Sequence, residues 1–236
     1  MAEFQAEITR LQASSTITGT ILASDTNTIV LNELIDQTLL AQAATENGYS
    51  VDDTLLQSRI SALEDQLGGT QALTNWQATH GYSGEDFVRA LKRSIGAAWM
   101  RDQIIAAVPE IADEVHVMQI LVPTSAKADQ VYASLQSGKD FLDIAATYDP
   151  VTKGDLGWFP RGYLSEPAIE KAAFALQPGQ YSEVIQTDIG FHILYLVERD
   201  PEHTLQPDAG RALQVRVLQE WLSERRNQSE IHILLP

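Results

Sequence analysis

The stretch Gly154-Asp155-Leu156-Gly157-Trp158-Phe159 sets two glycines among apolar residues, which is typical of a glycine-hinged loop entering a short apolar strand. An amphipathic pattern over residues 166–176 follows and predicts a helix. After a turn at Gln177-Pro178-Gly179, the run Gly190-Phe191-His192-Ile193 indicates a strand that bears one histidine. The sequence therefore predicts a strand, a helix and a strand in this order.

The residues upstream of this stretch extend the same pattern. A β-prone run covers residues 115–122, helical patterns follow over residues 125–135 and 141–148, and another strand pattern covers residues 182–186. We therefore expect an α+β unit over residues 114–199 with an antiparallel sheet of four strands.

The first part of the chain has a helical period instead. Residues 28–108 read as four helices around a shared apolar seam, with a stop at Gly68-Gly69 and a start at Ser83. Ser50 with Asp53 resembles a capping pair for the second of these helices. No catalytic constellation lies on them, so chemistry is expected in the later unit.

The segment after Arg199 has a different composition. Residues 200–207 contain prolines at both ends and are predicted to be a linker. The apolar residues that follow recur at helical spacing and predict an amphipathic helix too apolar to be a free tail. They are Leu213, Val217, Trp221 and Leu222.

Composition excludes several classes of function. The 236 residues are enough for two domains of ordinary size, the formal net charge is −16, and there is no cysteine. The acidic balance without a basic stripe argues against nucleic-acid binding, and the lack of cysteine removes disulfides and thiolate chemistry. No run approaches the roughly 18 apolar residues of a membrane span.

These blocks, in this order, resemble the parvulin family of peptidyl-prolyl cis/trans isomerases over residues 114–199. The helical region, residues 1–110, resembles the chaperone part of bacterial extracytoplasmic foldases of the SurA and PrsA type. The resemblance implies that residues 205–236 return to this region, so that a parvulin-like unit is inserted in an all-α chaperone domain. It also implies an extracytoplasmic location. Because residues 2–8 start at once in helical style, we expect that an upstream signal or anchor segment is absent from this chain.

The resemblance also implies a site. Its polar positions read Gln119, Asp149, Thr187 and His192, where the family commonly has histidine at the first position. Its apolar, substrate-binding positions read Leu156, Leu164, Ile169 and Phe174. His116 lies three residues before Gln119, so strand alternation places it on the other face of the sheet, where it cannot replace the missing histidine.

Rotation about an X-Pro bond meets a barrier of about 18 to 20 kcal/mol and needs neither nucleophile nor metal. We therefore expect no metal and no cofactor, and unfolded or extended polypeptides with X-Pro bonds as partners. Three hypotheses stay open: an active isomerase and foldase, a chaperone with a weak or inactive parvulin-like unit, and a structural or docking module. The residues at Gln119 and Ile169 favour the second hypothesis. The first is favoured by Asp149, Thr187, His192 and Leu164. Both a monomer and a homodimer stay open.

Overall fold

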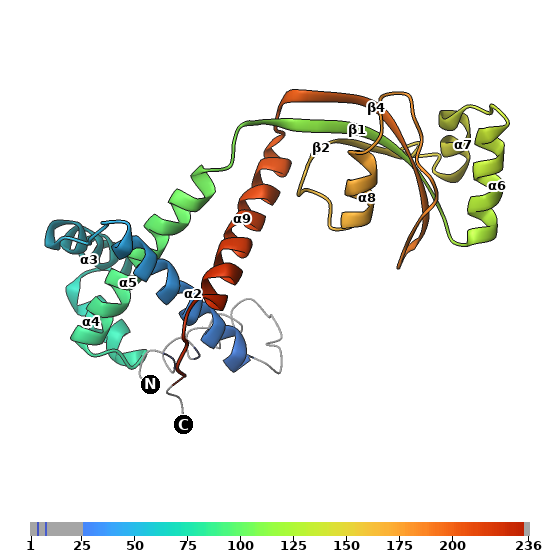
Figure 1. Ribbon diagram of the computed structural model, residues 1–236. Coiled ribbons are helices and arrows are strands. Elements are labelled where there is room, and N and C mark those ends of the chain that lie inside the picture. The colour runs from blue at the N-terminus through green and yellow to red at the C-terminus, as the bar shows by residue number, and fades with distance from the viewer. Residues whose placement is uncertain (1–3, 5–7, 9–25, 234–236) are drawn as a thin grey trace. The chain divides into compact units, whose positions relative to one another are not determined.

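The computed structural model describes residues 4, 8 and 26–233 of the chain (Figure 1). The expected helical start at residues 2–8 lies largely outside the described residues. The chain divides into two compact units, one of residues 1–107 with 217–236 and the other of residues 108–216. Each unit is described by itself below.

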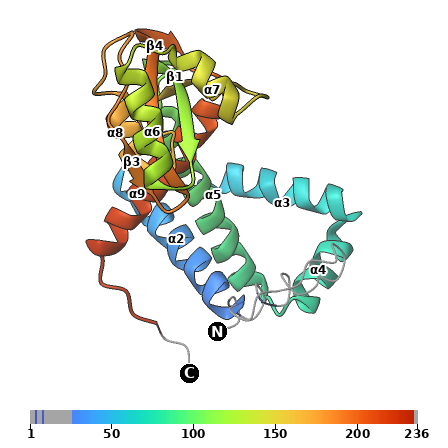
Figure 2. The ribbon, with the colours of Figure 1, turned by 90° about the vertical axis from the view of Figure 1, so that its right-hand side faces the viewer.

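The first unit is helical (Figure 2). Its helices and the helix that enters it at Val217 are α2 (Thr26–Glu46), α3 (Asp53–Leu67), α4 (Thr70–Thr79), α5 (Gly84–Ala106) and α9 (Pro207–Asn227). The four helices predicted before residue 108 are thus present, and Ser83 caps α5 through a hydrogen bond from the Asp86 amide. The predicted cap of α3 was wrong. Asp52, not Ser50, accepts the Leu55 amide at 2.8 Å, because its carboxylate lies directly before the first turn.

Close packing of α2 on α5 organises this unit. A Cβ added at Gly96 of α5 would lie 3.7 Å from Ala41 of α2, so small residues on both helices let them approach. The second half of α9 packs on the same seam, where Val217, Leu218, Trp221 and Leu222 contact a core of Leu40, Ala97 and Ile104. An ion pair of 2.6 Å between Arg226 Nε and Asp36 Oδ1 adds a polar contact between α9 and α2.

The second unit contains a four-stranded antiparallel sheet, which confirms the predicted fold class. The sheet order is β2-β1-β4-β3, and all pairs are antiparallel. Its elements are β1 (Ile111–Val122), α6 (Ser125–Gln136), α7 (Phe141–Tyr148), β2 (Asp155–Pro160), α8 (Pro167–Ala173), β3 (Ile185–Thr187) and β4 (Gly190–Thr204).

The predicted linker over residues 200–207 was wrong. Strand β4 continues to Thr204, which pairs with Ile111 of β1. Pro201 has no amide hydrogen for a ladder, but the register shifts between Ala112 and Glu114, so that Pro201 and Glu202 lie opposite a single residue of β1. Such a bulge tolerates proline within a strand, which a reading of proline as a boundary misses.

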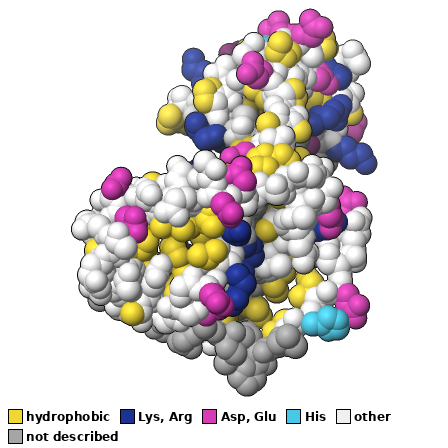
Figure 3. Space-filling model, turned by 90° about the vertical axis from the view of Figure 1, so that its left-hand side faces the viewer, with side chains coloured by type: hydrophobic (Ala, Val, Ile, Leu, Met, Phe, Trp, Pro, Cys, Tyr) yellow, Lys and Arg dark blue, Asp and Glu magenta, His cyan; other side chains and the backbone are white. Residues whose placement is uncertain are grey.

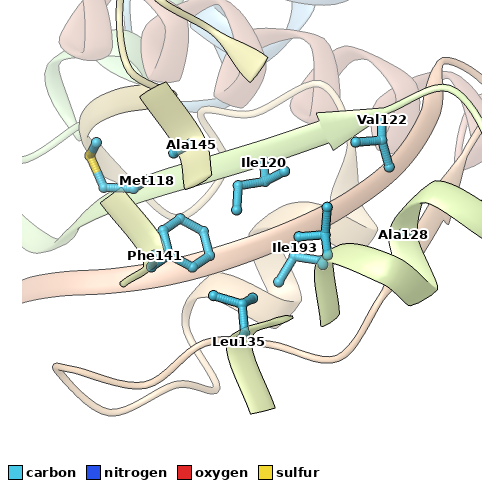
Figure 4. Close-up of a cluster of buried hydrophobic side chains, with 9 residues drawn as sticks. Met118, Ile120, Val122, Ala128, Leu135, Phe141, Ala145 and Ile193 are labelled. Atoms are coloured by element: carbon cyan, nitrogen blue, oxygen red, sulfur yellow. The ribbon is translucent and has the colours of Figure 1, made fainter. Parts of the chain in front are cut away.

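The sheet has an apolar core on each face. Helices α6 and α7 cover one face, where Met118, Ile120 and Val122 of β1 pack with Ile193 (Figure 4). Helix α8 covers the other face, where Val115 and Val117 pack with Leu194 and Leu196 (Figure 1). Alternation along β1 therefore assigns odd-numbered residues such as position 119 to the α8 face.

Among the described residues, no helix combines the length and the apolar character that crossing a membrane requires.

Candidate functional site

Three of the predicted polar residues form one hydrogen-bonded chain on the α8 face. His192 Nε2 lies 2.7 Å from Thr187 Oγ1, and His192 Nδ1 lies 2.8 Å from Gln119 Oε1. His192 is only 3% exposed, whereas Thr187 and Gln119 are half-buried. This series of three hydrogen-bonded residues, called the polar chain below, thus has a buried centre at His192 and two ends closer to solvent.

The register of the sheet explains why these residues meet. Gln119 pairs with Leu194 and is therefore a diagonal neighbour of His192, two residues along β4. On the other side, Ile185 of β3 pairs with His192, so Thr187 is the corresponding diagonal neighbour. Three adjacent strands thus contribute one residue each.

The partners of His192 define its tautomer. A carbonyl oxygen such as Gln119 Oε1 can only accept, so His192 Nδ1 carries the proton and Nε2 accepts the Thr187 hydroxyl hydrogen. Burial lowers the pKa of His192 below 6.5, and the nearby Glu166 carboxylate acts in the opposite direction. The imidazole is therefore neutral at pH 7 and is held in one tautomer.

Asp149 is not part of the polar chain. Its carboxylate accepts from the Val151 amide at 3.0 Å and the Thr152 amide at 3.1 Å, and it also binds the Thr152 hydroxyl. These hydrogen bonds lower its pKa, the one from the Thr152 side chain most. Among the described residues, no hydrogen bond joins Asp149 to Gln119 or His192, so its carboxylate shapes the turn over residues 149–153.

Gly154 connects that turn to the polar chain. The backbone amide of Gln119 donates a hydrogen bond to the Gly154 carbonyl at 2.7 Å. Gly154 has a φ of +76°, and a Cβ at this position would lie 2.0 Å from the Gln119 carbonyl oxygen. Only glycine fits both the left-handed backbone and the close approach.

The predicted apolar residues all belong to the core cluster on the α8 face, but they differ in exposure. Leu156 and Leu164 are half-buried at its edge. Ile169 is 4% exposed and Phe174 is 6% exposed, so both lie within the core, and the Arg161 guanidinium covers the Phe174 ring at 4.0 Å. Of the four predicted apolar residues, only the two leucines therefore leave part of their surface accessible.

Glu170 supports this surface and was not predicted. Its Oε2 atom accepts from the amides of Gly162 at 2.7 Å and Leu164 at 3.3 Å. A carboxylate on α8 thus holds the turn that carries Leu164. No pattern in the sequence marks this role, because a glutamate at this spacing on a helix is usually solvated.

His116 occupies the other face, as strand alternation predicts. Its Nε2 atom lies 2.8 Å from Asp155 Oδ1, and its ring stacks on Trp158 with centroids 5.6 Å apart. His203 stacks on Trp158 as well and bonds to Glu114. Neither histidine reaches His192.

A cavity of about 540 Å³ opens between α6 and α7 on this other face, lined by residues such as Gln130, Lys139 and Tyr148. None of its lining residues belongs to the polar chain or to the predicted apolar surface.

Comparison with known proteins agrees with this geometry. The family described as Rotamase, PPIC-type PPIASE domain, matches residues 108–198. This stretch of the chain is therefore similar to PPIC-type PPIase domains. It contains all four predicted polar positions and the four predicted apolar ones.

Relatives extend the similarity beyond this domain. The foldase protein PrsA of Geobacillus sp. is 24% identical over 220 residues, which cover 87% of this chain and 75% of that protein. A Helicobacter pylori protein named for peptidyl-prolyl cis-trans isomerase activity is 33% identical over 133 residues. That match covers 50% of this chain, and the chain spans only 44% of the length of that relative.

The fold has a solved counterpart. A crystal structure of the peptidylprolyl isomerase PrsA from Bacillus cereus superposes with a TM-score of 0.55 at 22% identity, covering 86% of this chain and 83% of that one. Both units described above thus belong to a known PrsA-like fold.

Proposed function

We propose that this chain is a peptidyl-prolyl cis/trans isomerase that acts as a foldase on unfolded polypeptides. The observation that carries the proposal is the hydrogen-bonded chain of Thr187, His192 and Gln119 on the same face of the sheet as the half-buried Leu156 and Leu164. The PPIC-type PPIase match over residues 108–198 supports the same reaction. By resemblance to SurA- and PrsA-type foldases, the proposal includes an extracytoplasmic location.

In this proposal the apolar surface holds the proline ring and removes water from the amide. Loss of water disfavours the charge-separated resonance form, so the planar ground state loses stability relative to the twisted transition state. The two leucines supply this surface, and Glu170 keeps Leu164 in place.

The polar chain orients a donor. Because Gln119 Oε1 accepts from His192, its amide nitrogen is turned away from the imidazole. No hydrogen bond from that nitrogen is present within the described part of the chain, so it is available to a client. In the twisted amide the prolyl nitrogen becomes pyramidal and regains a lone pair, which a donor stabilises only in the transition state.

Gln119 therefore replaces only part of what the usual histidine can do. It keeps the hydrogen bond to His192 but cannot exchange tautomers with it. The proposal thus assigns His192 and Thr187 an orienting role and requires no proton transfer. Asp149 is a positioning residue that shapes the turn before Gly154.

The test uses a reporter protein whose refolding is limited by a trans-to-cis prolyl bond. The full chain should accelerate the slow refolding phase, while Thr187→Val and Gln119→Leu should each lower this acceleration at least tenfold. Gln186→Leu is a matched control, because Gln186 lies exposed on the same short strand as Thr187. Equal acceleration by the control and the two site variants would contradict the assigned roles.

A second candidate function is the holding of unfolded chains by the helical unit. Figure 3 shows hydrophobic side chains lining a hollow on the face of this unit formed by α3, α4 and α5. Trp76 of α4 and Phe87 of α5 form an aromatic contact between these helices, with ring centroids 6.4 Å apart. In this proposal residues 1–110 and 205–236 form the chaperone part and residues 114–199 the isomerase.

The two functions separate in an aggregation assay with the full chain. Thr187→Val should delay aggregation of an unfolded client as well as the natural chain does, since it leaves the helical unit unchanged. Loss of this delay in Thr187→Val would place client holding at the isomerase site. Sedimentation of the same samples tests whether the chain forms a homodimer.

A further inference from the structure

Two exposed aliphatic residues lie in the two turns that flank the polar chain. Val151 is 87% exposed and Ile189 is 74% exposed, the two highest values among the large hydrophobic residues that the structure describes. Exposure of a single apolar side chain is ordinary. The joint position of these two next to one site is not explained by folding, because neither contributes to a core cluster.

Both residues lie at the same end of the sheet. Val151 belongs to the turn before β2, and Gly154 at the end of that turn contacts Gln119. Ile189 lies in the tight turn between β3 and β4, and the adjacent Gly190 approaches the carbonyl of Val122 at the end of β1. The polar chain therefore has one exposed aliphatic residue on the β2 side and one on the β3 side.

Each turn is held by a residue predicted to be catalytic. The Val151 amide donates to Asp149 Oδ1 at 3.0 Å, and the Ile189 amide donates to Thr187 Oγ1 at 3.3 Å. The Thr187 oxygen that accepts from Ile189 is the one that bonds to His192. The backbone that presents Ile189 is thus fixed by the polar chain itself.

We propose that Val151 and Ile189 are specificity-determining residues that contact the client residues on either side of the proline. The substrate class is then X-Pro segments with large apolar side chains before and after the proline, as in the core-forming parts of unfolded proteins. This inference rests on the proposed function, since it places the proline at the polar chain.

The test is an NMR titration of the methyl-labelled full chain with two short peptides. One contains Leu-Pro-Phe and the other Ala-Pro-Ala in the same flanking sequence. The methyl signals of Val151 and Ile189 should shift with the apolar peptide. This peptide should bind about fivefold more tightly if the two exposed contacts together remove from water the area of little more than one methylene, since each methylene contributes about a fourfold change. The methyl signals of Val215, which is 56% exposed on α9, should stay unchanged.

Variants assign the preference to the two residues. Val151→Thr and Ile189→Thr should each reduce it to about twofold, whereas Val215→Thr should retain fivefold. Equal affinities of the natural chain for both peptides would overturn the inference. A preference that persists in a variant with both Val151→Thr and Ile189→Thr would overturn it as well. Magnetisation exchange in the same samples keeps the two claims apart. Exchange without a preference for either peptide would support the isomerase activity and contradict this inference. Preferential binding of the apolar peptide without exchange would support this inference and contradict the isomerase activity.

Discussion

Replacement of Gly154 by alanine tests how the turn and the polar chain are joined. The new Cβ would lie 2.0 Å from the Gln119 carbonyl oxygen and 3.3 Å from the Gln119 nitrogen. Both contacts are with backbone, so no side-chain rotation can relieve them. The turn must move away from β1, which breaks the 2.7 Å hydrogen bond from the Gln119 amide to the Gly154 carbonyl.

The cost has three parts. A left-handed φ costs a residue with a Cβ about 1 to 2 kcal/mol. Loss of the hydrogen bond adds about 0.5 to 1.5 kcal/mol. Displacement of the strand by overpacking adds roughly 1 to 3 kcal/mol. We therefore expect Gly154→Ala to lower the free energy of unfolding of the sheet-containing unit by about 2.5 to 6.5 kcal/mol, and to move the Gln119 side chain away from His192.

Gly157→Ala is the matched control. Gly157 lies three residues later, has a φ of +70°, and has no atom within 4 Å of an added Cβ. It should cost only the conformational part, about 1 to 2 kcal/mol. Urea unfolding of the full chain, followed by the NMR amide signals of β1, measures both values by linear extrapolation. Equal losses in the two variants would refute the close contact with Gln119.

Three further predictions follow. Because burial lowers the pKa of His192 below 6.5, the unfolded chain binds more protons than the folded chain just below that pH. The urea midpoint should therefore fall as the pH drops from 7 to 6, and it should fall less in His192→Gln. Asp140 caps α7 by accepting two amides, so Asp140→Ala should cost about 1 kcal/mol of unfolding free energy, and Asp140→Asn less. Asp113 pairs with Arg199 at a partly exposed site, so a double-mutant cycle with alanine at both positions should give a coupling of at most about 1 kcal/mol that 1 M salt reduces.

The sequence predicted the elements more completely than their ends or their contacts. Alternation placed His116 and Gln119 on opposite faces, because the side-chain period of a strand is two. It could not show that β4 continues through Pro201, because a bulge depends on the partner strand.

The candidate site was predicted through the resemblance to a family. The structure brings some of its predicted residues together and places others outside the group. The diagonal contacts of His192 with Gln119 and Thr187 follow from strand register, which no local pattern contains. The carboxylate of Asp149 bonds within its own turn, and Ile169 lies in the core, although both occupy family positions. Glu170 acts through two backbone amides, eight and six residues before it in the turn that precedes α8, and this contact leaves no sequence signal.

The most direct test of the central claim is magnetisation-exchange NMR on a short Leu-Pro-Phe peptide with the unmodified full chain. The account predicts exchange cross-peaks between the cis and trans proline signals within a mixing time of about one second. Without a catalyst this interconversion takes tens to hundreds of seconds. The cross-peaks should weaken strongly with Gln119→Leu and persist with Gln186→Leu. Absence of cross-peaks at a protein concentration that saturates the peptide would contradict the claim that the site with Gln119 in place of histidine catalyses prolyl isomerisation.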